Sequence, residues 1–446
     1  MTPVPESTPD APSERVPTAT ANLRPVAVSA LIGTTIEYYD FFIYGTAVAL
    51  VFGKVFFPGL GPTAGLMASF SVYSVAFVGR PLGALLFGHF GDRLGRKATL
   101  VASLLLMGVS TVAVGVLPGY GTWGIWAPAV LVLLRACQGV GLGGEWGGAA
   151  LLLAENAPPE RRGRYGAYLQ LGPCLGFFAA TGVFLLLSEG LSDQAFESWG
   201  WRVPFLASIG LVAVGLFVRL RITETPVFAQ EAERAKAPAV EVLREHGRTV
   251  LLAGGSIMVG YALFYLATTY SLAYATEQLG IDRGLMLTLL LAGSVLKGGA
   301  AWYCAGRSDR WGRRRMLLLA TVLAVGWSLL LFPLLETART PLLALGVVGA
   351  MVVLGCLFGP VAAYLPELFP TRVRYTGVSL AYNIGGVVGG ATAPLVATRL
   401  TGVYGTAEPV GWYLAGIGLA SLLCLYALVE TRGGDLRAPS RRLLPG

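Results

Sequence analysis

Long apolar runs separated by short charged segments make up nearly the whole chain. Each run has about 20 residues or more, the length at which an α-helix crosses the hydrocarbon core of a bilayer. Twelve runs can be placed, near residues 26–50, 64–89, 98–117, 124–154, 164–188, 201–220, 249–276, 284–305, 316–335, 341–365, 375–400 and 409–429. The pattern therefore predicts an all-α integral membrane protein with 12 transmembrane helices.

The polar segments divide these runs into two sets of six. Residues 221–248 are predicted to be a cytoplasmic linker between an N-terminal six-helix half, 25–220, and a C-terminal six-helix half, 249–430. Residues 1–24 are rich in Pro, Ser, Thr and Ala, which predicts a disordered N-terminal tail. Residues 431–446 are predicted to form a short C-terminal tail.

The distribution of lysine and arginine predicts the orientation of the helices. If the N-terminus is cytoplasmic, 25 of the 33 basic residues lie in cytoplasmic segments and 5 in external ones. This asymmetry follows the positive-inside rule and predicts a multi-pass protein of the cell (plasma or inner) membrane with both termini in the cytoplasm. Because the basic residues are dispersed over short loops, the net charge of +8 does not indicate nucleic-acid binding.

The composition also bears on the class of function. Charged residues make up 13% of the chain, against about 25% in soluble domains. The five cysteines all fall in apolar runs without metal-ligand spacing, and there are only two histidines and no nucleophile motif. These features predict no metal, no cofactor and no catalytic residues, and therefore a protein that is not an enzyme.

Charged motifs repeat once per half. GDRLGRK begins at Gly91 and SDRWGRR at Ser308, so that Asp92 and Asp309 are separated by close to half the chain. Glu155 and Glu367 form a second pair at nearly the same separation, and a Glu-Thr pair that ends each half forms a third. Near-constant offsets predict two halves related by a pseudo-twofold axis, as in transporters whose substrate site lies between repeats.

Several motifs resemble those of a known family. GDRLGRK and its repeat, together with RACQG at residues 135–139, resemble signatures of the major facilitator superfamily over essentially the whole chain. The segments EYYDF (37–41), VFGKVFFP (51–58), RPLG (80–83), GGEWGG (143–148), WGWRVPF (199–205) and ETPVF (224–228) resemble its metabolite:proton symporter family, which includes shikimate, α-ketoglutarate, citrate and proline/betaine carriers. The resemblance implies the major facilitator fold and transport coupled to a proton gradient.

Three acidic residues within the apolar runs are candidates for proton coupling. Glu37 and Asp40 are three residues apart on the first predicted helix and lie on neighbouring positions of one face, so the pair could share one proton. Alternatively, one of them pairs permanently with Arg80 or Arg135. Glu145 is predicted to lie on the same side of the fourth helix as Arg135, among glycines that favour a tight helix–helix seam.

Three cations within the runs are candidates for binding an anionic substrate. Arg135 offers a guanidinium suited to a carboxylate, as the resemblance also implies, and Lys297 lies too far from the end of its run for comfortable snorkelling. For Arg80, substrate binding and an ion pair with the first-helix acids are equally open. Polar residues predicted to help are Tyr44, Gln138 and Asn383, with weaker candidates at Gln170, Tyr261, Tyr265, Tyr270, Tyr274 and Tyr382.

The repeated charged motifs are predicted to form a cytoplasmic gate. The resemblance implies that they bridge helices within or across the halves when the carrier faces outward; enforcing topology alone would not explain the acids. The predicted gate residues are Gly91, Asp92, Arg93, Gly95 and Arg96, the C-terminal set Asp309, Arg310 and Arg313, and the charge sets Glu155, Arg162, Glu367 and Arg374.

Together these features predict proton-coupled symport, by alternating access, of a small carboxylate-bearing metabolite. That metabolite is a shikimate-like, keto or dicarboxylic acid, or a zwitterionic osmolyte. The predicted partners are this substrate, the proton and the lipid bilayer, with the monomer as the functional unit. The alternative within the same superfamily is a proton-driven exporter of drugs or metabolites, against which the three buried cations argue. A membrane enzyme or sensor would need a catalytic constellation or signalling domain that the sequence does not contain.

Overall fold

The structure is a computed structural model that describes residues 24–94, 96–143, 145–221 and 238–434. Within these residues every regular element is a helix. Residues 1–23 of the predicted tail 1–24, residues 222–237 of the linker, Gly95 and residues 435–446 lie outside the described residues, and Arg24 begins α1. For the predicted gate residues Gly91, Asp92, Arg93 and Arg96, the description is limited to the backbone.

The N-terminal half contains six long helical units. They are α1 (Arg24–Ala47) continued by η1 (Val48–Phe52) and α2 (Gly53–Phe56), α3 (Pro62–Leu94), α4 (Arg96–Val116), α6 (Trp126–Leu142) with α7 (Glu145–Asn156), α8 (Arg162–Gly190), and α10 (Val203–Arg221). Short connections are α5 (Tyr120–Trp123), η2 (Pro159–Arg161), α9 (Asp193–Ser198) and η3 (Gly200–Arg202).

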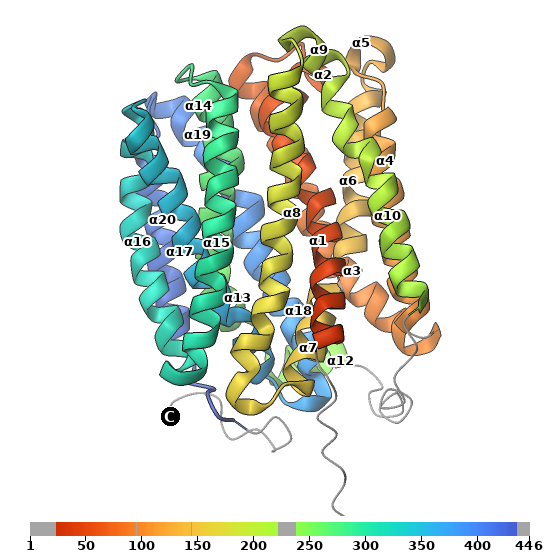
Figure 1. Cartoon of the computed structure of the whole chain (residues 1–446), viewed down its shortest axis with the longest axis vertical. Helices are drawn as coiled ribbons and strands as arrows, with labels where there is room; N and C mark the ends of the chain where they lie inside the picture. Colours follow the sequence, from red (N-terminus) through yellow and green to blue (C-terminus); the bar gives the residue numbers. More distant parts are fainter. Residues whose placement is uncertain (1–23, 95, 144, 222–237, 435–446) are drawn as a thin grey trace, which may run out of the picture.

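The C-terminal half repeats this arrangement. After α12 (Pro238–Glu245) come α13 (Gly247–Tyr265) with η4 (Leu266–Tyr270) and α14 (Ser271–Glu277), α15 (Arg283–Trp311), α16 (Arg313–Glu336), α17 (Thr340–Glu367), η5 (Thr371–Val373), α18 (Arg374–Gly385) with η6 (Gly386–Ala391) and α19 (Thr392–Tyr404), and α20 (Glu408–Tyr426). Figure 1 shows the long helices running in parallel or antiparallel directions through one bundle.

The twelve predicted helices are confirmed. Eleven described helices are long and apolar enough to cross a membrane, and α4 supplies a twelfth, shorter apolar segment over Val101–Val116. The fourth predicted run corresponds to α6, which ends at Leu142, and α7, which begins at Glu145, and both belong to one candidate span, Trp126–Asn156.

The two halves also share an irregularity that the sequence motifs do not show. The first helix of each half contains a π-helical turn, at Val48–Phe52 and at Leu266–Tyr270. These turns are separated along the chain by almost the same interval as Asp92 and Asp309. Because π-turns are rare and concentrate at functional sites, their recurrence at equivalent positions supports the internal duplication.

Contacts between the halves are made mainly by three helices of the N-terminal half, of which α7 packs against α17 and α18. α3 packs against α18, η6 and α19, while α8 packs against α15 and α17. In Figure 1, α8 and α15 run side by side. Within each half, α4 packs on α10 and α16 packs on α20.

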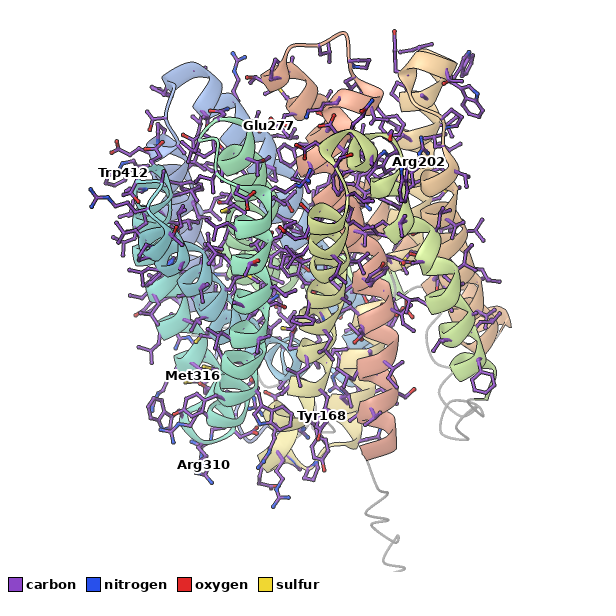
Figure 2. All side chains as sticks on the ribbon, turned by 45° about the horizontal axis from the view of Figure 1, so that its top comes forward. Tyr168, Arg202, Glu277, Arg310, Met316 and Trp412 are labelled. Carbon is purple, nitrogen blue, oxygen red and sulfur yellow. The ribbon has the colours of Figure 1, made fainter. Side chains whose placement is uncertain are left out.

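The outer helices present large apolar side chains to the surroundings. Examples are Phe217 on α10 and Trp412 and Leu423 on α20. Figure 2 shows Trp412 pointing away from the bundle. Such an exposed apolar surface is suited to lipid hydrocarbon and not to water.

Candidate functional site

A glycine-lined seam between α3 and α6 places two arginines in the middle of the molecule. A Cβ atom on Gly139 would clash with the backbone at Ala76, and one on Gly143 would clash with the backbone at Arg80. Only glycine permits this approach, which is the packing that small residues allow between membrane helices. The seam brings Arg80 of α3 and Arg135 of α6 to the same aromatic ring.

The two guanidinium groups lie around the ring of Phe41. The Arg80 Cζ atom is 4.3 Å from the centroid of this ring, and the Arg135 Cζ atom is 4.4 Å from the same centroid. Arg80 also lies over Phe77, and Arg135 over Tyr44 and Tyr73. Each contact is a cation–π interaction, which offsets only part of the cost of burying a charge.

Neither arginine has a carboxylate partner among the described residues. Arg80 is 2% exposed and Arg135 is 0% exposed. The Nε and Nη2 atoms of Arg80 and the Nη2 atom of Arg135 have no hydrogen-bond partner there. The other Arg135 nitrogens donate to Gln138 Oε1 (3.0 Å) and, weakly, to the Tyr73 carbonyl (3.4 Å). Buried cations with unsatisfied donors are suited to binding an anion.

A cavity between the halves adjoins Arg80. It is lined by Glu37, Tyr38, Arg80, Leu142, Gly143, Trp146 and Gly147 of the N-terminal half and Ser379, Tyr382 and Asn383 of the C-terminal half. Its volume of about 10 Å³ is close to that needed for one water molecule. Of the predicted site residues, Glu37, Arg80 and Asn383 therefore meet at one cavity, which is closed to a metabolite in this conformation.

Aromatic and polar contacts across the halves close this cavity. The Tyr38 and Tyr382 hydroxyls are 2.8 Å apart, and the Trp146 ring stacks on the Tyr382 ring with centroids 3.6 Å apart. Asn383 Nδ2 donates to the Gly143 carbonyl (3.1 Å). Trp146 is not among the predicted site residues, although it lies in the GGEWGG motif.

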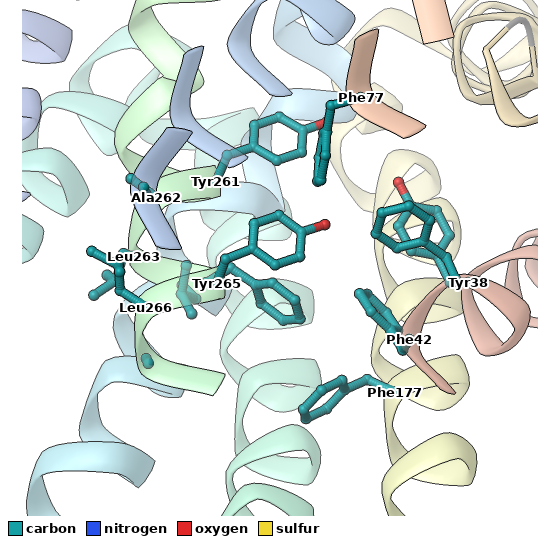
Figure 3. Packing of buried hydrophobic residues seen from close by; sticks show 14 of the residues in the cluster. Tyr38, Phe42, Phe77, Phe177, Tyr261, Ala262, Leu263, Tyr265 and Leu266 are labelled. Atoms are coloured by element: carbon teal, nitrogen blue, oxygen red, sulfur yellow. The ribbon is translucent and has the colours of Figure 1, made fainter. Parts of the chain in front are cut away.

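A layer of aromatic rings fills the centre beside Arg80. Phe42 of α1 packs on Phe264 of α13 (centroids 5.1 Å apart), and Phe77 of α3 packs on Tyr265 (5.2 Å). Figure 3 shows Tyr261 and Tyr265 pointing from α13 toward this layer, with Tyr38, Phe42 and Phe177 opposite them. These rings join the halves through apolar contact, so any passage through the centre requires them to separate.

Asp40 lies away from the cavity, inside the N-terminal half. Its side chain is buried, and Oδ1 accepts a hydrogen bond from Ser208 Oγ of α10 (2.6 Å). Oδ2 has no hydrogen-bond partner among the described residues. Glu37, by contrast, lines the cavity. The two acids of the first helix thus contact different neighbours.

Four other predicted site residues lie outside the cavity. Tyr44 is fully buried beneath the Arg135 guanidinium, and Gln138 Nε2 donates to Thr111 Oγ1 (2.8 Å). Lys297 is buried in α15 with its Nζ atom 4.4 Å from the centroid of the Phe264 ring, and it does not line the cavity. Glu145 is half-buried at the start of α7.

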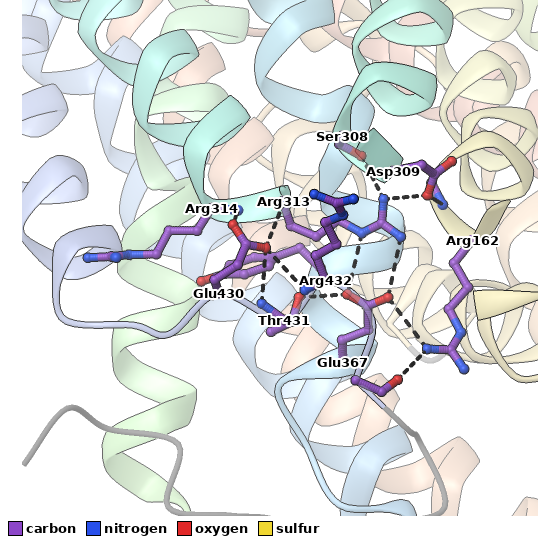
Figure 4. A network of polar contacts seen from close by, with 12 residues as sticks. Arg162, Ser308, Asp309, Arg313, Arg314, Glu367, Glu430, Thr431 and Arg432 are labelled. Atoms are coloured by element: carbon purple, nitrogen blue, oxygen red, sulfur yellow. Dashed lines mark hydrogen bonds and ion pairs between the residues drawn. The ribbon is translucent and has the colours of Figure 1, made fainter. Parts of the chain in front are cut away.

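A network of charges, drawn in Figure 4, lies where α8 and α16 begin. We call it the end network. Arg313 Nη1 is 2.6 Å from Asp309 Oδ1, and its Nε is 3.4 Å from Glu367 Oε2. Arg162 of the other half lies 3.8 Å from Glu367. Glu430 accepts from the backbone N–H groups of residues 313, 314, 431 and 432.

The end network also joins the two halves. Asp309 Oδ1 and Oδ2 accept from the backbone N–H groups of Gly163 (2.8 Å) and Arg164 (3.0 Å), at the start of α8. Arg374 Nη1 is 3.0 Å from Glu155 Oε1, again across the halves. The predicted gate residue Arg310 is exposed and is not brought into the network.

Comparison with known proteins agrees with this geometry. The family model of the Major Facilitator Superfamily matches residues 30–394 and, in a second match, residues 252–443. The chain is 47% identical to the inner membrane metabolite transport protein YhjE of Escherichia coli, over 92% of this chain and 95% of that protein. It is 36% identical to the Escherichia coli shikimate transporter (90% and 94%) and 32% identical to the proline/betaine transporter of Salmonella typhimurium (93% and 85%).

Solved structures show the same fold at much lower identity. The xylose transporter XylE from E. coli, in a partially occluded inward-open conformation, superposes with a TM-score of 0.74 at 18% identity, over 93% of this chain and 99% of that chain. With twelve helices in two repeated halves and relatives that match nearly end to end, this chain belongs to the Major Facilitator Superfamily, as a membrane transporter akin to the metabolite, shikimate and proline/betaine carriers.

Proposed function

We propose that this transporter carries a small carboxylate-bearing metabolite together with a proton. The observation that carries the proposal is the pair of buried guanidinium groups of Arg80 and Arg135 in the middle of the bundle, neither of which has a carboxylate partner among the described residues. A cation buried without a counter-charge is costly, and an anionic ligand removes that cost. The named substrates of the relatives, shikimate, proline and betaine, all contain a carboxylate.

In this proposal the substrate occupies the enlarged cavity between the halves. Arg80 lines it, and its Nε and Nη2 atoms, which have no hydrogen-bond partner among the described residues, suit a bidentate contact with a carboxylate. The hydrogen bond of Asn383 to Gly143 and the stack of Trp146 on Tyr382 each join the two halves. A substrate bound there would therefore contact both halves. Lys297 would be a further cation, reached through the Phe264 side of the aromatic layer.

The proton is carried by acids of the N-terminal half. Asp40 is the leading candidate, since it is buried and its Oδ1 atom accepts from the uncharged hydroxyl of Ser208. An apolar environment favours the neutral form of a carboxyl group, so a proton that arrives there is held until the surroundings change. Glu37 and Glu145 are the other candidates, and no cofactor beyond the proton gradient is required.

Alternating access supplies the change of surroundings. We propose that the end network faces the cytoplasm, as the arrangement of basic residues predicts, and that it closes that side while the carrier is open outward. Asp309 and the Arg374–Glu155 pair would part when the halves rock. We propose that the monomer is the functional unit of this cycle.

The test is uptake into liposomes that contain the purified protein. We expect labelled shikimate, α-ketoglutarate, citrate or betaine to accumulate when the outside is more acidic than the inside, and accumulation to collapse with a protonophore. Competition among the four compounds identifies the preferred class. Accumulation that persists with the protonophore would show that transport is not coupled to protons.

Two variants separate binding from coupling. Asp40→Asn removes the proton-binding group, so we expect exchange of labelled for unlabelled substrate to continue while accumulation stops. Arg80→Gln removes the carboxylate partner, so both should be lost. If Asp40→Asn accumulated substrate as the unaltered protein does, Asp40 would not be the coupling residue, and Glu37→Gln and Glu145→Gln would be examined in the same way.

A further inference from the structure

Asp40 is the centre of a polar cluster enclosed within the N-terminal half. The cluster consists of Asp40 on α1, Thr111 on α4, Arg135 and Gln138 on α6, and Ser208 on α10; we call it the Asp40 cluster. Ser208 and Thr111 are both completely buried. Four buried hydroxyl, carboxyl and guanidinium atoms in and beside it have no hydrogen-bond partner in the described residues: Asp40 Oδ2, Tyr44 Oη, Tyr73 Oη and Arg135 Nη2.

Hydrogen bonds connect Arg135 to the neighbourhood of Asp40. Arg135 Nη1 donates to Gln138 Oε1 (3.0 Å), and Gln138 Nε2 donates to Thr111 Oγ1 (2.8 Å). The Thr111 hydroxyl donates to the Met107 carbonyl (2.9 Å) and also faces the Asp40 carboxyl group. The Oε1 and Nε2 atoms of Gln138 are therefore both hydrogen-bonded. The bond from Nε2 occupies one lone pair of the Thr111 hydroxyl oxygen.

Each hydroxyl has an alternative acceptor. Ser208 Oγ is 2.6 Å from Asp40 Oδ1 and 3.5 Å from the Pro204 carbonyl of its own helix. Thr111 has Met107 O on its helix and Asp40 on the other side. A hydroxyl hydrogen can turn toward a carboxylate when Asp40 is ionised and back to a carbonyl when Asp40 is protonated. Both states of Asp40 are thus accommodated without moving a helix.

Among the described residues, the other charged and titratable groups near Asp40 do not take the place of the Ser208 and Thr111 hydroxyl groups. Glu37 and Tyr39 belong to α1 itself. From α6, Arg135 is connected to the cluster through Gln138. From α8, the backbone packs on α1 through Gly172 and Gly176, and α4 and α10 contribute the hydroxyls.

We propose that Ser208 and Thr111 are positioning residues of the Asp40 proton site, and that Gln138 links this site to the anion-binding guanidinium of Arg135. This inference rests on the proposed proton-coupled transport. When the site opens, the proton leaves the Asp40 carboxyl group for an entering water molecule, and the two hydroxyl groups keep their hydrogens and turn them toward the carboxylate. A substrate anion that draws Arg135 away from Gln138 Oε1 would free the Gln138 amide to turn relative to the Thr111 oxygen to which it donates, which couples the two ligands.

The test compares matched variants in the liposome assay across a range of pH. Thr111→Val and Ser208→Ala remove one hydroxyl each and keep the shape. Because a hydrogen bond to a charged group contributes about 1.5–3 kcal/mol, each removal should displace the pH dependence of substrate exchange toward higher pH by about one to two units. Thr111→Ser and Ser208→Thr restore the hydroxyl and should restore the profile.

Controls come from buried hydroxyls of the same half. Ser110→Ala removes a hydroxyl that bonds to its own helix at Leu106, next to Thr111. Thr181→Val removes one on α8 that has no hydrogen-bond partner in the described residues. Both should keep the unaltered pH profile, which shows that loss of a buried hydroxyl is not by itself enough to displace it.

The outcomes distinguish this inference from the proposed function. If the unaltered protein shows no accumulation driven by a pH gradient, the proposed function fails. If it does accumulate substrate, and Thr111→Val and Ser208→Ala have unaltered pH profiles, the positioning role is overturned. Should Thr111→Val not be recovered as folded protein, Ser208→Ala decides alone. Gln138→Leu should in addition lower the ratio of accumulated substrate while leaving exchange in place, and an unchanged ratio would remove the link to Arg135.

Discussion

Buried arginines occur in two regions of this transporter, and their surroundings are opposite. In the end network, Arg313 lies between Asp309 and Glu367, and Arg374 meets Glu155. In the centre, Arg80 and Arg135 lie on aromatic rings with N–H groups that have no partner among the described residues. Burial is similar in both regions. We therefore propose that the end network holds the fold together as it stands, whereas a ligand completes the centre.

This comparison predicts opposite responses to neutralising one charge. Removing a partner from a buried ion pair leaves an uncompensated charge and destabilises, while removing an unpaired buried charge relieves a desolvation cost. Stability should thus be lost at the end network and transport at the centre.

The largest effect is expected for Arg80→Gln. Without the guanidinium, the substrate carboxylate loses a charge-assisted, bidentate contact, and we expect uptake at low substrate concentration to fall by about 100-fold or more, or ~3 kcal/mol. The melting temperature of the purified protein should be unchanged or higher. Uptake and thermal unfolding in detergent are to be measured on the same preparation.

Arg339→Gln is the matched control for Arg80→Gln, because Arg339 is exposed in a loop of the other half. It should transport and unfold as the unaltered protein does. A lower melting temperature for Arg80→Gln would show that the central cation stabilises the fold, and the contrast between the two regions would be lost.

Glu367→Gln should have the second-largest effect, this time on stability. Its carboxylate approaches Arg313 and Arg162 and accepts from Thr431 Oγ1 (2.6 Å). Gln removes the negative charge and leaves buried guanidinium groups less well compensated, which should cost about 3 kcal/mol. The measurement is the apparent melting temperature, with Glu408→Gln, an exposed acid of α20, as the control. Unaltered melting would mean that Asp309 alone compensates Arg313.

Asp309→Asn tests the contact between the halves. Asp309 accepts from two backbone N–H groups at the start of α8 and from Arg313. An amide can accept at only one of its two positions, so the closed state should lose about 2 kcal/mol, which is ~30-fold in the ratio of closed to open molecules. Spin labels at the exposed positions 161 and 315 would report longer distances. An unaltered distance distribution would place the contact between the halves elsewhere.

The sequence predicts the architecture well because length and apolarity are enough to identify a membrane helix. The twelve helices are confirmed, and Asp309, Arg313 and Glu367, all predicted gate residues, fall in one network. Their proximity could be expected because each is a charged residue next to the end of an apolar run, and the bundle gathers such ends at one surface. The structure leaves the N-terminal motif without described side chains, so its gating role remains a prediction.

The central site is only partly predictable, for a physical reason. Helical spacing shows which residues of one helix share a face, but not which helix that face meets. Glu37 and Asp40 share a face, yet one reaches the cavity and the other reaches Ser208 of α10. The sequence does not predict Trp146 as a site residue, because its ring stacks on Tyr382 of the other half, a contact that sequence spacing does not show. The sequence identifies the glycines of the α3–α6 seam as packing residues. It does not show that their close packing brings Arg80 and Arg135 to the Phe41 ring.

Lys54→Ala should have the smallest effect. It tests whether burial determines how much an ion pair contributes to the stability of this transporter. Lys54 and Glu197 form an ion pair, but their side chains are 61% and 39% exposed. Water screens such a pair, and its two long side chains lose freedom when they meet, so the loss should be below about 0.5 kcal/mol. Uptake and melting temperature should both match those of the unaltered protein. A loss comparable to that of Glu367→Gln would mean that the presence of an ion pair, and not its burial, sets the stability of this transporter.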